Sequence, residues 1–160
     1  MAKKFTKAQI DGAREYFQKQ RCMEVTAEIE GRQFRYFIIP QKLNPSLPNF
    51  AVRVTGEKGD GYVLGVADTI PEILRGYVAF HEYIEFVELG VDTPNRCKKA
   101  LEEELRAVPL EIKKEHSILR SKFFKDLLIY AETEEEMTEE DKEEFRESLR
   151  HLERIAQQFL

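Results

Sequence analysis

His81, Glu82 and Glu85 place three ionisable side chains in the apolar stretch AFHEYIEFVEL, in the pattern HExxE. Residues four apart lie on the same face of an α-helix, so His81 and Glu85 can point into one space while Glu82 projects about 100 degrees around the axis. A buried charge without a partner is costly, so these groups need counter-charges or a metal ion nearby. An imidazole and a carboxylate can bind a divalent cation, and an adjacent carboxylate can take a proton from water that the cation polarises.

The stretch resembles the HExxH motif of the zincins, a class of zinc peptidases, and differs from it at one position. The resemblance implies that His81 is the first metal ligand, that Glu85 occupies the second ligand position and that Glu82 is the catalytic general base. In the gluzincins a glutamate of the next helix is the third ligand. Glu104 is the inward-facing candidate for it here, with His116 as a less favoured substitute. Because a carboxylate replaces an imidazole, the implied divalent metal is zinc, manganese or iron.

Two functions therefore remain open for the HExxE stretch. One is a metal-dependent hydrolase of peptide or amide bonds, or a degenerate relative of such an enzyme. The other is a non-catalytic protein-protein interaction or adaptor protein, in which HExxE is structural ion pairing and the C-terminal helices contact a protein partner or a second copy of the chain. An enzyme needs a cleft beside His81 with room for metal and substrate, whereas an adaptor buries these groups in complementary pairs.

The sequence gives little support to other kinds of active site. A ferritin-like di-iron site needs glutamate three residues before a histidine, but the residues at those positions are Val78, Lys113 and Ser148. No serine lies in a nucleophile elbow, and no glycine-rich phosphate loop leads into a helix. Cys22 and Cys97 lack metal-binding or redox spacing, so both are expected to be reduced thiols.

Composition limits the partners that we expect. The formal net charge is -5 and the pI is near 5.4, which argues against nucleic-acid binding. A basic stretch is interpreted as a solvated helix face: Lys113, Lys114, Arg120, Lys122 and Lys125. Charged residues interrupt the longest apolar run, from Ile70 to Leu89, so no membrane span is expected. The lysines near the start precede no apolar segment, which predicts a cytoplasmic protein.

The hydrophobic pattern predicts a single α+β domain over residues 1–160, with a helix and sheet in 1–67 and a helical layer in 68–160. The first part is predicted to hold a helix from Thr6 to Gln20, with Thr6 as its N-cap, and a four-stranded, mainly antiparallel sheet. Its strands are expected in two hairpins, Glu24 to Glu30 with Gln33 to Ile39, and Phe50 to Thr55 with Tyr62 to Val66.

Four helices are predicted after the sheet. The first is expected to begin near Asp68 or Thr69, with Pro71 in its first turn, and to end at Gly90. The second begins at Pro94 and runs to about Val108, and a third follows Pro109. After the acidic segment from Glu132 to Glu144, a final amphipathic helix is marked by Phe145, Leu149, Leu152, Ile155 and Phe159.

Overall fold

The computed structural model describes residues 4–57, 61–133 and 138–157, without the side chains of 131–133, 141 and 155–157. Its first helix, α1, spans Lys7–Lys19 and begins with a capping box. The Gln9 amide donates to the Thr6 hydroxyl at 3.2 Å, and the Gln9 side chain accepts from the Thr6 amide at 2.9 Å. These reciprocal bonds satisfy amides that the first helical turn leaves unpaired. The predicted helix and its Thr6 cap are confirmed.

Four strands form one mixed sheet in the order β1-β2-β4-β3. They are β1 (Met23–Ile29), β2 (Arg32–Ile39), β3 (Ala51–Thr55) and β4 (Tyr62–Ala67). β1 pairs antiparallel with β2, and β3 with β4, while β2 and β4 run parallel to each other. The mainly antiparallel sheet and its two hairpin pairings are therefore confirmed. The first turn falls at Glu30 and Gly31, one residue earlier than expected, and both residues have positive φ angles.

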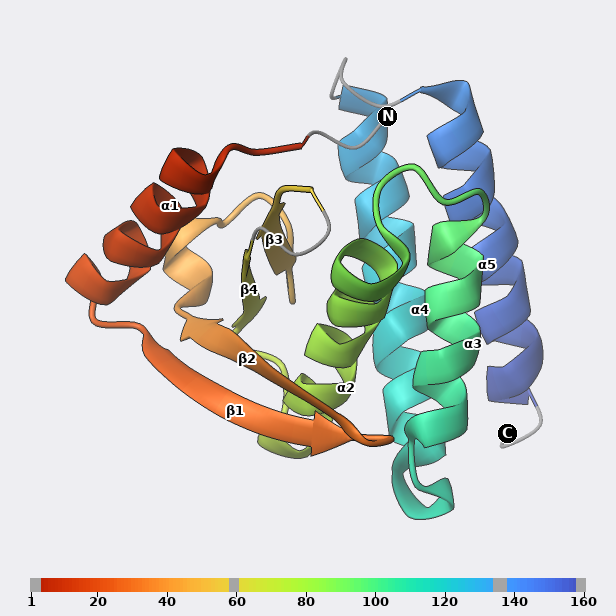
Figure 1. Cartoon of the computed structure of the whole chain (residues 1–160). Helices are drawn as coiled ribbons and strands as arrows, with labels where there is room; N and C mark the ends of the chain where they lie inside the picture. Colours follow the sequence, from red (N-terminus) through yellow and green to blue (C-terminus); the bar gives the residue numbers. More distant parts are fainter. Residues whose placement is uncertain (1–3, 58–60, 134–137, 158–160) are drawn as a thin grey trace.

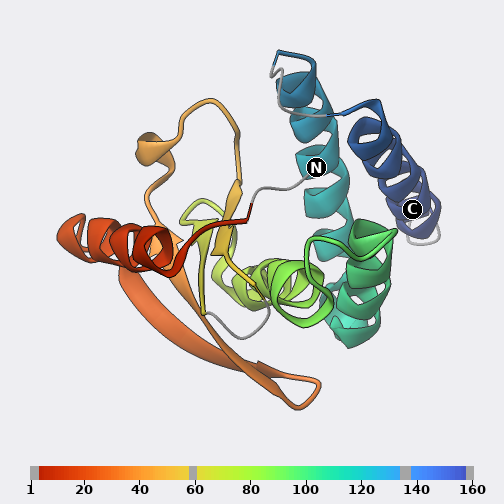
Figure 2. The ribbon, with the colours of Figure 1, turned by 45° about the horizontal axis from the view of Figure 1, so that its top comes forward.

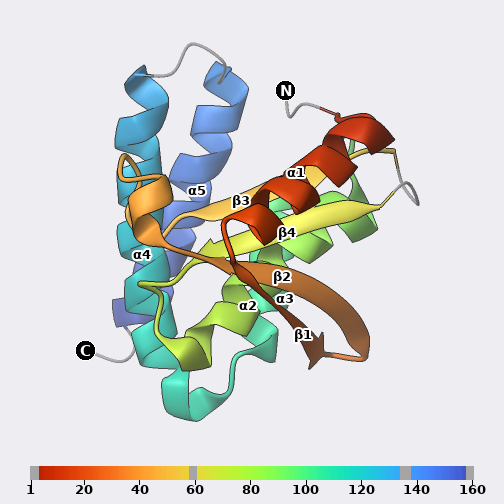
Figure 3. The ribbon, with the colours of Figure 1, turned by 90° about the vertical axis from the view of Figure 1, so that its left-hand side faces the viewer.

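The sheet is covered on both faces by helices (Figure 1). Viewed from the side in Figure 3, α1 crosses in front of the strands and α2 lies behind them. The remaining helices stand on the far side of α2, away from the sheet (Figure 2). α2 is thus the central element, because one of its faces packs on the sheet and another on the helical layer.

The central helix changes its pitch where the HExxE stretch lies. α2 spans Glu72–Glu82, and the chain continues without a break into a π-helical segment, η2 (Tyr83–Leu89). Gly90 ends this segment as predicted, with φ 89° and ψ 158°, a conformation that suits glycine. The π-helical pitch was not expected. Such segments are rare and often occur at functional sites, because they rotate side chains relative to a regular helix.

The expected cap of α2 is wrong. Pro71 occupies the N-cap position, where the described part of the chain shows no side-chain cap hydrogen bond. Asp68 instead accepts a hydrogen bond from the Gln41 amide, and the Thr69 hydroxyl donates to Asn49. Both candidate caps are therefore used to fix the loop between β2 and β3.

Three helices complete the helical layer, α3 (Arg96–Ala107), α4 (Leu110–Thr133) and α5 (Glu139–Gln157). Together with α2 they confirm the prediction of four C-terminal helices. α3 begins two residues after the expected Pro94, with Asn95 as its N-cap. The centre of the acidic segment, residues 134–137, lies outside the described part of the chain, as do the side chains of Ile155 and Phe159 in the predicted amphipathic stripe.

The interpretation of α4 as carrying a solvated basic face is wrong at Arg120. This side chain is 1% exposed, and His116 on the preceding turn is 0% exposed. Ile118 of the same helix, although apolar, is 48% exposed. The inward stripe of α4 is therefore partly polar, and its charges must be matched inside the protein.

Candidate metal centre

The HExxE side chains lie where α2 passes into the π-helical segment. His81 and Glu82 belong to the last turn of α2, and Glu85 belongs to η2. The Gly90 amide donates to the Glu85 carbonyl at 3.2 Å, the five-residue spacing of a π-helix. His81 and Glu85 are 2% and 5% exposed, so the structure places both inside the protein.

The His81 ring lies between two carboxylates. Its Nε2 is 2.9 Å from Oε2 of Glu85, and its Nδ1 is 2.8 Å from Oε1 of Glu104. The Nδ1 contact is not aligned for a hydrogen bond, so it is mainly electrostatic. The predicted residues Glu85 and Glu104 are thus both brought to His81, but to opposite nitrogens of the ring.

Glu104 is the most enclosed carboxylate of the cluster, with 0% exposure. Its Oε2 contacts Nε2 of His116 and is 2.9 Å from Nε of Arg120. An NH2 group of Arg120 also donates to Oε1 at 3.2 Å. One carboxylate therefore faces three nitrogen-bearing side chains from two different helices.

Cys97 approaches Nε2 of the His81 ring, the nitrogen that also faces Glu85. Its Sγ is 3.8 Å from Nε2 of His81 and 3.7 Å from the Ser148 hydroxyl. One ligand atom from each of His81, Glu85 and Cys97 lies within 4.8 Å of the other two. Glu144 of α5 accepts a hydrogen bond from the Cys97 amide at 2.8 Å, which fixes the first turn of α3.

Burial and mutual contacts shift the ionisation of these groups. Burial alone would lower the pKa of His81, but its contacts with Cys97, Glu104 and Glu85 raise that pKa well above 6.5. Burial opposes ionisation of Glu104, but Arg120 and His116 keep the pKa of its carboxyl far below the usual range. Burial and the charge of Glu85 raise the pKa of Cys97 to about 11. These shifts favour the charged form of the His81 imidazole, the ionised form of Glu104 and the neutral form of the Cys97 thiol.

Glu82, the predicted general base, is the least satisfied carboxyl group of the HExxE stretch. It is 9% exposed, and within the described residues it forms no hydrogen bond or ion pair. Burial, followed by the negative charge of Glu85, raises its pKa. A raised pKa suits a proton carrier, but among the described residues the group of potential metal ligands comprises His81, Glu85 and Cys97 and does not include Glu82.

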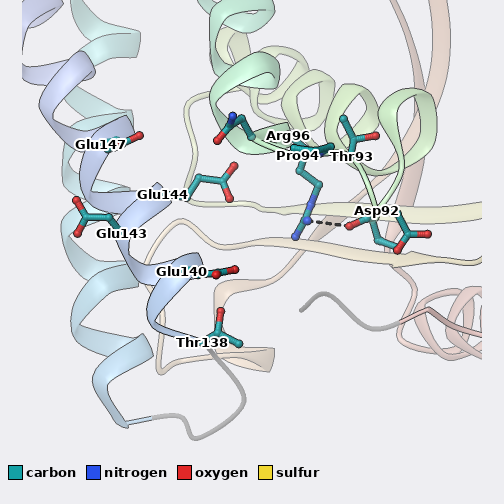
Figure 4. Close-up of a pocket in the computed structure, with 11 residues that line it drawn as sticks. Asp92, Thr93, Pro94, Arg96, Thr138, Glu140, Glu143, Glu144 and Glu147 are labelled. Atoms are coloured by element: carbon teal, nitrogen blue, oxygen red, sulfur yellow. Dashed lines mark hydrogen bonds between the residues drawn. The ribbon is translucent and has the colours of Figure 1, made fainter.

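A surface depression lies between α5 and the loop before α3 (Figure 4). It measures about 580 Å³, and its acidic lining consists of Asp92, Glu140, Glu143, Glu144 and Glu147. Arg96 also lines it and connects it to the buried cluster, since its Nε is 3.3 Å from Oε1 of Glu85. His81, Glu85 and Cys97 are not among the lining residues, so this depression does not open onto them.

Part of this cluster was predicted from the sequence. Helical spacing identified His81 and Glu85, and the gluzincin resemblance together with its inward position identified Glu104. The structure brings these three residues together. Arg120 was assigned to a solvated face and Cys97 to an ordinary thiol. The position of Cys97 on the inward stripe of α3 was the available signal, because that stripe also carries Glu104.

Comparisons with protein-family models, with curated proteins and with solved structures found no match to this chain. Within the described residues, no helix combines the length and apolar character needed to cross a membrane.

Proposed function

We propose that this protein is a metal-binding protein, a degenerate relative of the zincins whose HExxE stretch holds one divalent cation without hydrolysing a substrate. The observation that carries the proposal is the position of the His81 ring between two carboxylates, with Glu85 facing Nε2 and Glu104 facing Nδ1. Metal-ligating histidines commonly present one nitrogen to the ion and the other to a carboxylate, which fixes the ring. His81 and Glu85 are then ligands, as their spacing predicts.

The burial of the cluster supports a closed site over a catalytic one. Catalytic zinc sites keep one position open for water and substrate, whereas structural sites are enclosed by protein ligands. His81 is 2% exposed and lines no part of the described depression. A metal bound by His81 and Glu85 would fix the junction of α2 with the π-helical segment.

Structural ion pairing, with function at the protein surface, is the second candidate. The specific observation in its favour is the hydrogen-bond distance of 2.9 Å between Nε2 of His81 and Oε2 of Glu85, because an imidazolium between Glu85 and Glu104 would satisfy the cluster without a metal. The raised pKa of His81 agrees with this arrangement. The protein would then act through its surfaces on a protein partner or a second copy.

Elemental analysis separates the two candidates. Untagged protein purified without chelator, and again after incubation with zinc, manganese or iron, is compared with His81→Ala and with the control His151→Ala, which alters a histidine of α5 outside the cluster. The proposal predicts about one ion per chain in wild type and in His151→Ala, and none in His81→Ala. A wild-type protein that takes up no metal under any condition would overturn the proposal and favour ion pairing.

A further inference from the structure

We propose that Cys97 is the third ligand of this site, which makes it a His81–Glu85–Cys97 centre selective for thiolate-binding cations such as zinc. The inference rests on the proposed metal-binding function and adds a ligand and a class of metal to it. It replaces Glu104, the ligand implied by the gluzincin resemblance, with a residue of a different chemistry on the same helix.

The distances between ligand atoms suit three of the four positions of a tetrahedral site around one ion. Zinc bonds of about 2.0 Å to nitrogen or oxygen and 2.3 Å to sulfur place tetrahedral N and S ligands roughly 3.5 Å apart. The separation of Nε2 and Sγ is 3.8 Å, close to this value. Nε2 and Oε2 of Glu85 are 2.9 Å apart, as in a hydrogen bond, so a cation between them would widen the pair by about half an ångström.

The position of Cys97 in its helix also suits a metal-bound thiolate. Cys97 is the second residue of α3, whose N-terminus carries a positive partial charge that stabilises an anion. The Ser148 hydroxyl lies 3.7 Å from Sγ and can donate to a thiolate there. A bound cation removes the proton of a coordinating thiol, so the neutral thiol of Cys97 does not prevent binding.

Glu104 is better placed to position His81 than to bind the ion. It faces Nδ1, on the ring edge away from Nε2 and Glu85, and its oxygens already contact His116 and Arg120. The guanidinium of Arg120 would also repel a cation at that edge. Arg96 approaches Glu85 as well, but it contacts Oε1 and leaves Oε2 directed at the ring.

The chemistry of the three ligands narrows the range of metal ions that the site is expected to bind. A thiolate, an imidazole and a carboxylate together favour zinc over manganese, magnesium or calcium, which prefer oxygen ligands. The set also predicts binding of cobalt and cadmium, which report a thiolate ligand spectroscopically. Both ions can serve as probes for the full-length protein.

The test is a cobalt titration of the reduced full-length chain, followed by absorbance and competition with zinc. The matched control is Cys22→Ser, which removes the other free cysteine of the chain. Wild type and Cys22→Ser should bind about one cobalt and show a thiolate charge-transfer band in the near ultraviolet, and Cys97→Ser should lose the band. Cadmium NMR of the wild type should report one thiolate ligand, which keeps the test decisive if Cys97→Ser does not fold.

The possible failures are distinguishable. Cobalt that binds in wild type and is lost in His81→Ala, but gives no thiolate band and no thiolate cadmium shift, overturns the role of Cys97 and leaves the proposed function standing. Absence of cobalt and zinc binding overturns both. If Glu104 positions His81 and does not bind the ion, the Glu104→Gln variant should bind cobalt about 10 to 100 times more weakly and keep the thiolate band. A changed band would instead mark Glu104 as a ligand.

Discussion

Between the sheet and α2 the buried side chains are mostly apolar, as with Phe34, Leu64 and Phe80. On the opposite side of α2, the interface with α3 and α4 buries Glu104 and Arg120 in contact with each other. Apolar burial is non-directional and roughly proportional to area, so it tolerates exchange among side chains of similar volume. A buried polar cluster needs every partner in place, because each unpaired charge costs several kcal/mol. The two sides of α2 therefore have different tolerance to substitution.

The cluster is weak evidence for stability as such. Ion pairs removed from water often contribute no more than apolar residues of the same volume would. A ligand that these groups hold together would offset the cost of burying them in the centre of the helical layer.

The largest effect is expected at Glu104. Glu104→Gln keeps the shape of the side chain but leaves Arg120 and His116 without their counter-charge, so the free energy of unfolding should fall by about 3 to 5 kcal/mol. The control is Glu103→Gln on the same helix, whose partners Arg32 and Arg106 are closer to solvent. It should cost less than about 1 kcal/mol in the same denaturant titration. Equal losses would contradict the difference between the interfaces.

Two glycines of the central helix offer a second comparison. Gly90 has φ 89°, so Gly90→Ala should strain the end of the π-helical segment and lower stability by about 1 to 3 kcal/mol. Gly76 faces the sheet within α2, where an added Cβ meets Ile29 at an ordinary 3.7 Å. Gly76→Ala should therefore raise stability by about 0.5 to 1 kcal/mol. Thermal unfolding should give a lower melting temperature for Gly90→Ala and a higher one for Gly76→Ala than for wild type. Melting temperatures that shift in the same direction in both variants would contradict the account of the π-helical end.

A conservative change in the apolar interface should have a smaller effect. Leu64 of β4 is 1% exposed and packs in the core beneath α2. Leu64→Met nearly conserves volume, so the loss of stability should stay below about 1.5 kcal/mol by chemical denaturation. A loss as large as that of Glu104→Gln would show that shape matters as much here as pairing does in the helical layer.

The smallest effect is expected for a pair at the surface. Arg32 donates to Glu88 at 2.9 and 3.1 Å, with side-chain exposures of 27% and 37%. Solvent screens such a pair, so Glu88→Gln should cost less than about 1 kcal/mol. The cost should fall further as salt is added to the unfolding experiment. A cost of several kcal/mol, independent of salt, would place this pair with the buried cluster.

The sheet could be predicted from the sequence because its signals are local. Alternation in β1 and β2, and the glycine at their turn, specify the hairpin without knowledge of the rest of the fold. The Thr6 cap and the end of the central helix at Gly90 are local in the same sense. The parallel pairing of β2 with β4 was not predicted, because it depends on how the two hairpins pack together.

Residues of the candidate site could be predicted within each helix, but the contacts between helices could not. Spacing identified His81 with Glu85, and the inward stripe of α3 identified Glu104. The contact of Cys97 with His81 joins residues 16 apart on different helices, and no local pattern specifies it. Arg120 was assigned to solvent because basic residues surround it in sequence, although its counter-charge lies on α3.

A crystal structure of the zinc-loaded protein, with anomalous diffraction recorded on both sides of the zinc absorption edge, tests the central claim most directly. The account predicts one anomalous peak within bonding distance of Nε2 of His81, the Glu85 carboxylate and Sγ of Cys97, with Glu104 still beside Nδ1. No peak in this cluster, or a peak bound by Glu104 and His116 instead, would contradict it.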